Sequence, residues 1–407
     1  MDSTDLPMFE RIRAASVPRR AQQFAFLRDL VRIDTSPTQT DPDLAASRVA
    51  SLIEDLGLTV ELVKADGGRF PNLISRLVGG EGPTLAFVSH LDTVAAGDGW
   101  KYGPLDGKID DGALYGLGAI SGKGHLAAQV FAILAMMDAS AKFDGVIEIH
   151  VSFDGENGGV RGAKWLLEQE LVKPDMAIVG GPARGVAQYA TGVIRMDVDV
   201  IGASAPAFAP ERGHDALEAT VQALSRLYQF RSGLSGHRSS IPGVGEPALV
   251  VESISGGNPA GGVPDKVTFR LERRVVPSED PSVVEKQLTR LIGSTVATIP
   301  GVRCRIRRTL LLPPMEPNAA SKPLYSAVRK ILQRHLDEAS TPLGIACETE
   351  ARFYAAAGIP TVLYGAGPLD MAGAGLYGVD EHQDLNELRL ATDVLACSAE
   401  QLLRASG

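Results

Sequence analysis

The sequence lacks the features that mark disulfide-rich, membrane-spanning and nucleic-acid-binding proteins. Its 407 residues include three widely spaced cysteines and no C-x-x-C pair, which argues against a disulfide framework or a cysteine zinc site. Its longest apolar-rich run, residues 126–137, is too short to cross a bilayer and predicts a buried helix. A net charge of −9 lacks the basic excess that nucleic acid phosphates require. We therefore expect neither membrane nor nucleic acid as a partner.

The amino-terminal segment also lacks an apolar core. Residues 1–20 are polar and charged, so we expect no signal peptide and a cytoplasmic location, where thiols stay reduced. With 44% apolar and 22% charged residues, the composition is that of an ordinary globular protein. The length exceeds what one small core accommodates and predicts two domains.

Strands alternate with helices in the first part of the chain, which predicts an α/β fold with a mixed sheet between helices. The expected strands cover residues 59–63, 72–77, 84–89 and 146–153. An expected helix over 124–139 precedes the last of them. His90 and Asp92 directly follow the third strand, at the sheet edge where ligands bind in open α/β folds.

The pattern changes near residue 188. Between residues 192 and 312 the expected elements follow the order βαββαβ, a ferredoxin-like split motif. Helical and strand patterns of the first type return over 323–336, 361–364 and 385–404. We therefore expect a discontinuous α/β domain over 1–188 and 313–407, with an inserted α+β domain over 189–312.

Two stretches resemble a known enzyme family. The family's H-x-D and W motifs resemble Ser89-His90-Leu91-Asp92-Thr93-Val94 and the later Trp100. Its G-R-G-x-x-D-x-K-G motif resembles Gly-Leu-Gly-Ala-Ile-Ser-Gly-Lys-Gly, residues 116–124. This is the zinc aminoacylase/carboxypeptidase family of acetylornithine deacetylases, succinyl-diaminopimelate desuccinylases and glutamate-releasing carboxypeptidases. The resemblance spans nearly the whole chain. It implies that the inserted domain is a lid and a possible homodimer surface.

The resemblance also implies a two-zinc centre, but this sequence has few of its ligands. His90, Asp92 and Glu156 match the family's first ligand, its orienting aspartate and another ligand. The other matching positions carry unsuitable residues: Ser121 for the bridging aspartate, Gly155 for the general base, Gly181 and Tyr377 for ligands, and Pro206 for the lid histidine. A neutral hydroxyl cannot hold two dications together, so we expect no metal cofactor. Zinc would bind only through shifted ligands, for which the candidates are His125, Asp154, His150 and His382.

The residues that remain suggest acid–base chemistry. Asp92, His90 and Ser121 would supply an orienting group, a base and a nucleophile for acyl transfer. Alternatively, His90 is a general base, with Glu156 as acid and Tyr377 as proton donor or oxyanion partner. This arrangement suits cyclisation, elimination, isomerisation, amide formation or hydrolysis. Ser121 as a small filler is the third possibility.

Two arginines suggest the kind of substrate. Arg274 matches the lid arginine with which the family grips a substrate carboxylate, and Arg273 competes with it for that role. Arg352 aligns with a T-D-A-R segment; it is a candidate to face the cleft, and a position away from the cleft is the alternative. We expect a small, amino-acid-like substrate with a carboxylate or an amide. Three interpretations stay open: an enzyme with metal-independent chemistry, a non-catalytic metabolite- or partner-binding relative, and an ordinary zinc-dependent amidohydrolase or peptidase.

Overall fold

The computed structural model describes residues 7–36, 41–258, 260–336, 343–371 and 373–404. The chain divides into two compact units. The first comprises Met1–Gln188, Pro317–Leu343 and Thr349–Gly407. The second comprises Tyr189–Glu316 and Gly344–Glu348. The inserted unit is therefore not one continuous segment, because five residues from the later part of the chain belong to it.

An eight-stranded mixed sheet with the order β1-β2-β6-β3-β7-β14-β8-β13 contains the strands that position the site. The bounds are β1 Val60–Ala65, β2 Phe70–Val78, β3 Thr84–His90, β6 Val146–Ser152, β7 Met176–Val179, β8 Ala187–Ala190, β13 Leu343–Ile345 and β14 Thr361–Leu363. Strand β3 pairs in parallel with β6 and β7, and β7 pairs in parallel with β14. The carboxyl ends of these four strands therefore meet at one edge of the sheet.

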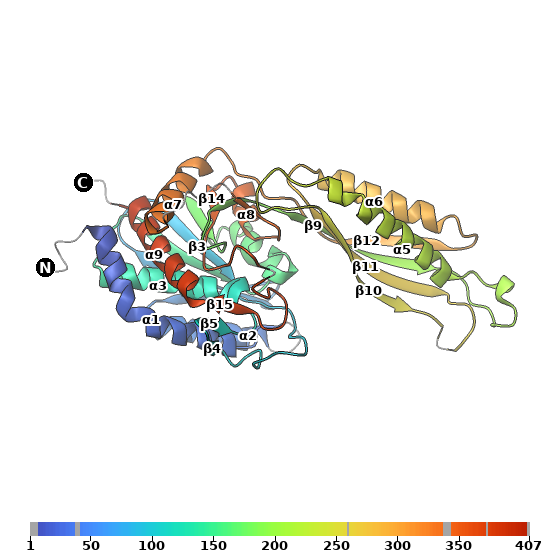
Figure 1. Cartoon of the computed structure of the whole chain (residues 1–407), viewed down its shortest axis with the longest axis horizontal. Helices are drawn as coiled ribbons and strands as arrows, with labels where there is room; N and C mark the ends of the chain where they lie inside the picture. The colour runs from blue at the N-terminus through green and yellow to red at the C-terminus, as the bar shows by residue number, and fades with distance from the viewer. Residues whose placement is uncertain (1–6, 37–40, 259, 337–342, 372, 405–407) are drawn as a thin grey trace. The chain divides into compact units, whose positions relative to one another are not determined.

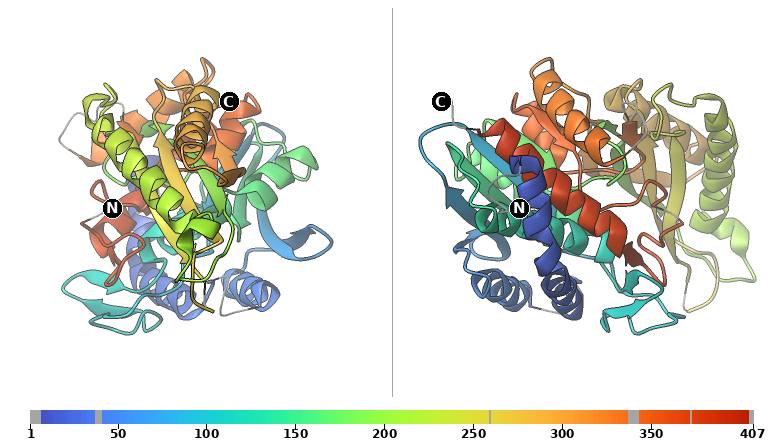
Figure 2. Two further views of the ribbon diagram at one scale, coloured as in Figure 1. Left: turned by 90° about the vertical axis from the view of Figure 1, so that its right-hand side faces the viewer. Right: turned by 60° about the vertical axis from the view of Figure 1, so that its left-hand side comes forward.

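Helices of the first unit form a hydrophobic core with this sheet (Figure 1). Their bounds are α1 Met8–Arg32, α2 Pro42–Glu54, α3 Gly124–Asp138, α4 Trp165–Glu168, α7 Ser321–His335, α8 Ala351–Ala356 and α9 Leu385–Leu402. Helix α9 lies beside α1 and α3, as both figures show (Figure 2). The stretch Ala119–Asp138 is apolar and long enough to cross a membrane, but 89% of it is buried. Packing in the core accounts for its apolar composition.

Smaller elements bring distant segments to the site. A three-stranded sheet has the order β15-β5-β4, with bounds β4 Lys108–Asp110, β5 Ala113–Tyr115 and β15 His382–Asp384. A π-helical turn, Ala119–Lys123, leads directly into α3, and a 3₁₀ turn, Gly155–Asn157, follows β6. Because β15 pairs with β5, the residue before β15, Glu381, lies next to the π-helical turn.

The second unit confirms the split βαββαβ motif. Its elements are β9 Gly192–Ile201, α5 Ala216–Ser232, β10 Ala248–Gly256, β11 Lys266–Val275, α6 Pro281–Val296 and β12 Arg303–Leu312. The strands form an antiparallel sheet with the order β10-β11-β9-β12. The α/β fold with an inserted α+β domain is therefore confirmed, whereas the homodimer stays a prediction.

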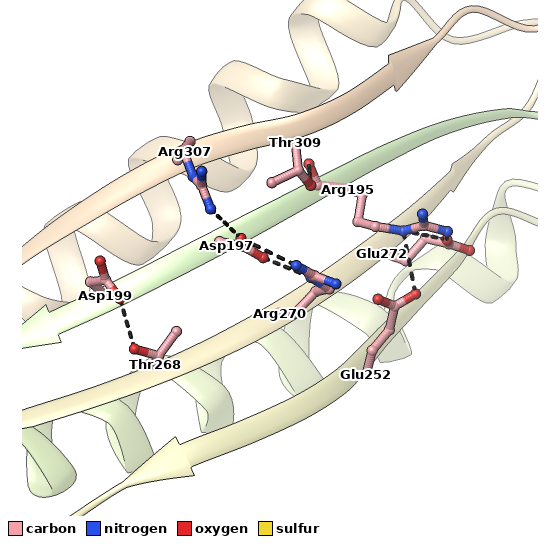
Figure 3. A network of polar contacts seen from close by, with 9 residues as sticks. All are labelled: Arg195, Asp197, Asp199, Glu252, Thr268, Arg270, Glu272, Arg307 and Thr309. Atoms are coloured by element: carbon pink, nitrogen blue, oxygen red, sulfur yellow. Dashed lines mark hydrogen bonds and ion pairs between the residues drawn. The ribbon is translucent and has the colours of Figure 1, made fainter. Parts of the chain in front are cut away.

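Alternation along β9 separates an apolar from a charged face of this sheet. The buried side chains pack beneath α5 and α6: Ile194, Met196, Val198 and Val200. On the other face Arg195 pairs with Glu272, and Asp197 pairs with Arg270 and Arg307 (Figure 3). Cross-strand pairs of opposite charge of this kind stabilise neighbouring strands and neutralise the face.

Candidate functional site

His90 and Asp92 lie together at the carboxyl end of β3. His90 Nδ1 is 3.2 Å from Asp92 Oδ1, and the imidazole keeps 21% of its surface exposed. Asp92 is buried, and its two oxygens also accept hydrogen bonds from the backbone N–H groups of Gly155 (2.8 Å) and Glu156 (2.9 Å). One carboxylate therefore orients the imidazole and fixes the turn that follows β6.

Gly155 faces the imidazole of His90 at close range. A β-carbon built on Gly155 would lie 2.2 Å from Cγ and 2.5 Å from Nδ1 of His90. Real β-carbons do not approach other atoms so closely, so a side chain at position 155 requires the ring to move. The ring thus occupies the space into which a glutamate at this position would project.

Glu156 and Tyr377 form a second part of the site. Oε1 of Glu156 is sealed from solvent without a hydrogen-bond partner in the described part of the chain. Burial raises the pKa of Glu156 to about 8, helped by the charges of Asp92 and Glu381 and opposed by His90 and a hydrogen bond from Tyr377. The structure therefore brings His90, Asp92, Glu156 and Tyr377 together in the first unit.

Ser121 does not complete the arrangement expected from the sequence. In the described part of the chain its hydroxyl makes no hydrogen bond to His90, so the Asp92–His90 pair is not extended to a nucleophile. The reason is local: Ser121 belongs to the π-helical turn, and its backbone N–H donates to Glu381 Oε1 at 3.2 Å.

Glu381 fixes the backbone of that turn. Its carboxylate also accepts from the N–H groups of Gly118 (3.1 Å) and Ile120 (2.9 Å), and the residue is 1% exposed. Burial raises the pKa of Glu381, while the three backbone donors and Lys123 oppose the shift. Sequence reasoning missed this role, because it considered the matching motif only for its missing histidine at position 377.

Glu350 is a second acidic group that sequence reasoning missed. Its Oε1 accepts a 2.7 Å hydrogen bond from Ser152, and its Oε2 is sealed from solvent without a partner among the described residues. Burial raises the pKa of Glu350 to about 7; the charge of Asp92 adds to the shift, and His90 and Ser152 oppose it. Glu350 belongs to the segment 348–352, in which the sequence singled out only Arg352. Arg352 is itself buried, and its Nε donates to the carbonyl of Thr349 at 2.7 Å.

His90 is the cationic centre of this group. Its burial favours the neutral ring, but Asp92, Glu156 and Glu350 outweigh burial and raise the pKa of His90 to about 10. The imidazole is therefore protonated at neutral pH. This charge state favours a role as proton donor and differs from the general-base role expected from the sequence.

The candidates for shifted metal ligands have other partners. His150 contacts Tyr354 and Glu148, each at 2.8 Å. His382 Nδ1 lies 2.8 Å from the carbonyl oxygen of Asp380. Asp154 accepts a hydrogen bond from the backbone N–H of Arg161. Nδ1 of His125 accepts one from the backbone N–H of Ala366.

The residues present do not fit a two-metal centre. In the described ranges no group of three or more His, Cys, Asp or Glu side chains is arranged to hold a metal ion. A β-carbon on Gly181 would lie 2.7 Å from the carbonyl carbon of Leu363 and 2.8 Å from the backbone nitrogen of Tyr364. Backbone therefore fills the space beside Gly181, as the imidazole fills the space beside Gly155. Position 181 therefore has no room for the family's carboxylate ligand, and position 155 has none for its general base.

The arginine expected to bind the substrate is already paired within the second unit. Arg274 forms ion pairs with Glu272, at 2.9 Å, and with Glu348. Arg273 is 1% exposed and pairs with Glu279, so it is a structural residue. Two carboxylates therefore balance the charge of Arg274, which weakens its case as a grip for a substrate carboxylate.

The fold and the site residues that match the family's motifs define a class of metallopeptidase-fold proteins. A family model described as peptidase family M20/M25/M40 matches residues 86–401. The chain belongs to this family, which confirms the resemblance seen in the sequence.

Named relatives match this chain over nearly its whole length. A succinyl-diaminopimelate desuccinylase from Gluconacetobacter diazotrophicus is 27% identical over 408 residues, which are 96% of this chain and 99% of that protein. One from Acidiphilium cryptum is 27% identical over 93% of this chain and 97% of its own length. Among solved structures, human carnosine dipeptidase 1 matches with a TM-score of 0.79 at 17% identity, over 98% of this chain and all of the other. The last similarity shows the fold alone.

Proposed function

We propose that this chain is an enzyme that acts on the amide bond of a small amino-acid-like substrate by acid–base chemistry, without a two-metal centre. Family membership supports the class of reaction, since the relatives that match over nearly the full length are named desuccinylases. The observation that carries the metal-independent part is the packing of Gly181 against the backbone of Leu363 and Tyr364, which leaves no room for the family's acidic ligand at this position.

The proposed reaction uses the groups around His90. A water oxygen attacks the amide carbon, and the proton lost by the water passes to the carboxylate of Glu350, which a pKa of about 7 leaves partly ionised at neutral pH. The C–N bond then breaks, and the leaving nitrogen takes a proton from the His90 imidazolium, which Asp92 holds in place. The hydroxyl of Tyr377 donates to Glu156 and so orients its carboxylate. Proton transfers by positioned groups of this kind contribute about 10²–10⁴-fold each to the rate.

The ordinary zinc-dependent hydrolase is the second candidate. It is favoured by the full-length similarity to succinyl-diaminopimelate desuccinylases. It requires ligands beyond His90 and Glu156, the two positions at which this chain keeps a residue of the family's ligand type.

One experiment separates the candidates. The protein is purified with and without chelator, its metal content is measured, and hydrolysis of N-succinyl amino acids, N-acetyl amino acids and dipeptides is followed. We expect turnover that survives chelation and does not rise with added zinc. Turnover that requires two equivalents of zinc per chain would establish the second candidate instead. A bound amino-acid derivative without turnover would favour a non-catalytic relative.

A matched pair of variants then tests the residues. Ser121→Ala should leave turnover within a few-fold of wild type, because the hydroxyl makes no hydrogen bond to His90 among the described residues. His90→Gln should lower kcat by about 10²–10⁴-fold through loss of the proton donor. A large loss in the serine variant would restore the nucleophilic role considered from the sequence.

A further inference from the structure

His125 is surrounded by glycines, and the proposed reaction gives it no role. We call its surroundings the glycine cage. The residue sits in the first turn of α3, between the segments that follow β7 and β14. A β-carbon would lie 2.4 Å from Cδ2 of His125 if built on Gly180, and 2.6 Å from its Nδ1 if built on Gly365. One on Gly367 would lie 3.2 Å from Cε1. Larger residues at Gly180 and Gly365 would collide with the ring, so these positions accommodate an imidazole.

Hydrogen bonds hold the walls of this cage together. Tyr364 N–H donates to the carbonyl of Val179 at 2.9 Å, and Gly367 N–H donates to the carbonyl of Gly181 at 3.0 Å. The carbonyl of Ala366 in turn accepts from the side chain of Gln383 at 2.8 Å. The ring thus rests against backbone that is bonded on both sides, which restrains its orientation.

The cage and His90 are at the same edge of the sheet. His90 ends β3, which pairs in parallel with β7, and β7 pairs in parallel with β14. A charge on His90 is near enough to lower the pKa of His125. Ligands of open α/β sheets bind beyond the carboxyl ends of such strands.

The tautomer of His125 is fixed by one backbone group. Ala366 N–H donates to Nδ1 at 3.0 Å, so in the neutral ring the proton is on Nε2. Burial, with the nearby charge of His90, lowers the pKa of His125 to about 3, which keeps the ring neutral. Nε2 makes no hydrogen bond within the described part of the chain, and the residue keeps 8% of its surface exposed.

We infer that the Nε2–H group of His125 donates a hydrogen bond to the carbonyl oxygen of the substrate amide. The inference rests on the function proposed above and names a substrate-binding residue for it. Negative charge develops on this oxygen as the amide carbon is attacked, and a preorganised donor stabilises it in the transition state. A neutral imidazole with a fixed tautomer serves this purpose in other enzymes. This chain needs such a donor, because Pro206 stands where the resemblance places the family's oxyanion histidine.

Two substitutions separate this role from a structural one. Asparagine at position 125 places an oxygen near the position of Nδ1 and keeps the acceptor for Ala366, but it loses the donor at Nε2. Glutamine places an amide N–H near the position of Nε2 and loses the acceptor. We expect His125→Asn to fold with a nearly unchanged urea midpoint and to lose about 10²–10³-fold in kcat. His125→Gln should retain at least tenfold more kcat than His125→Asn, even with a lower urea midpoint.

The reverse order would overturn the inference. If His125→Asn keeps wild-type turnover while His125→Gln loses both stability and turnover, the ring serves only as the acceptor for Ala366. Failure of the proposed function gives a different result, because turnover by the wild type would then be absent or strictly zinc-dependent.

A second measurement does not depend on turnover. Nitrogen NMR of ¹⁵N-histidine-labelled full-length protein reports the protonation of each ring of the seven histidines. We expect His125 to stay neutral with Nε2 protonated between pH 5 and 9, and its Nε2–H signal to shift on titration with N-acetylglycine. A proton on Nδ1, or no shift of the His125 signal at high N-acetylglycine, would contradict the inference.

Discussion

The imidazole of His90 and the α-carbon of Gly155 are packed so that a β-carbon on Gly155 would lie 2.2 Å from Cγ of the ring. The glycine is therefore more than a missing carboxylate. Its lack of a side chain allows the ring to stay beside Asp92, whose carboxylate also binds the backbone N–H of residue 155. One aspartate thus couples the identity of residue 155 to the orientation of the imidazole.

Substitution of Gly155 tests this coupling. We expect Gly155→Ala to destabilise the protein by about 1–3 kcal/mol, because overpacking forces the ring or the backbone to move. The measurement is urea unfolding, with the NMR signals of His90 as a local probe. Gly97→Ala is the matched control, since its β-carbon would meet no atom within 4 Å and its φ angle is not left-handed. Equal urea midpoints for the two variants would show that the His90 ring can move aside without loss of unfolding free energy.

The pKa of Glu350 predicts a loss of stability as pH rises. The folded protein holds the carboxyl at a pKa of about 7, whereas the unfolded chain holds it near its ordinary value of 4.5. The neutral form is therefore favoured by folding, and its contribution is complete below about pH 4.5 and lost as pH rises through 7. Because one pKa unit corresponds to about 1.4 kcal/mol, the full change is on the order of 3 kcal/mol.

The variant Glu350→Gln isolates this contribution. Its amide stays neutral, so the difference in unfolding free energy between variant and wild type should move in favour of the variant from pH 5 to pH 8. Urea unfolding at both pH values measures it, with Glu168→Gln as a control at an exposed site. A difference that does not change with pH would mean that Glu350 is ionised throughout this range.

Much of the fold could be predicted from the sequence, because its patterns are local. Strand β9 has the predicted bounds, since apolar and polar residues alternate along Gly192–Ile201. The start of helix α1 was not predicted, because residues 1–20 are polar and charged; the helix begins at Met8 and contains Pro18. Packing of its buried face against α3 and α9 outweighs the weak local propensity.

The site was predictable only where its residues belong to short motifs. His90 and Asp92 are two positions apart at a strand end and could be found. Glu350 bonds to a serine 198 positions earlier, and His125 bonds to a backbone group 241 positions later. Such contacts arise from the parallel order of the strands, so they cannot be predicted from a local sequence pattern.

Glu381 should hold the π-helical turn through its charge. In Glu381→Gln one oxygen is replaced by an NH₂ group, which cannot accept, so one or more of three backbone N–H groups loses its partner. We expect a loss of about 1–3 kcal/mol in stability and faster amide hydrogen exchange at residues 118–121. The exposed variant Glu168→Gln should change neither, because surface ion pairs contribute little. Unchanged amide exchange at residues 118–121 would mean that packing alone, and not Glu381, keeps this turn ordered.

The pair of Arg274 and Glu348 should show a large interaction energy. Each is about four-fifths or more buried, so Arg274→Ala leaves a carboxylate poorly solvated and should cost about 3 kcal/mol. The double variant with Glu348→Ala should cost less than the sum of the single variants, by about 1–3 kcal/mol in urea unfolding.

Lys173 and Glu170 supply the control cycle, because their side chains are 66% and 72% exposed and exposed ion pairs contribute only about 0.2–1 kcal/mol. If the Arg274 cycle gives an energy no larger than this control, the guanidinium is not committed to Glu348. Arg274 would then be available to a substrate carboxylate, as its position in the family pattern implied, and N-acetylglycine binding should weaken in Arg274→Ala. A large coupling with unchanged N-acetylglycine binding would instead make the arginine a structural residue of the second unit.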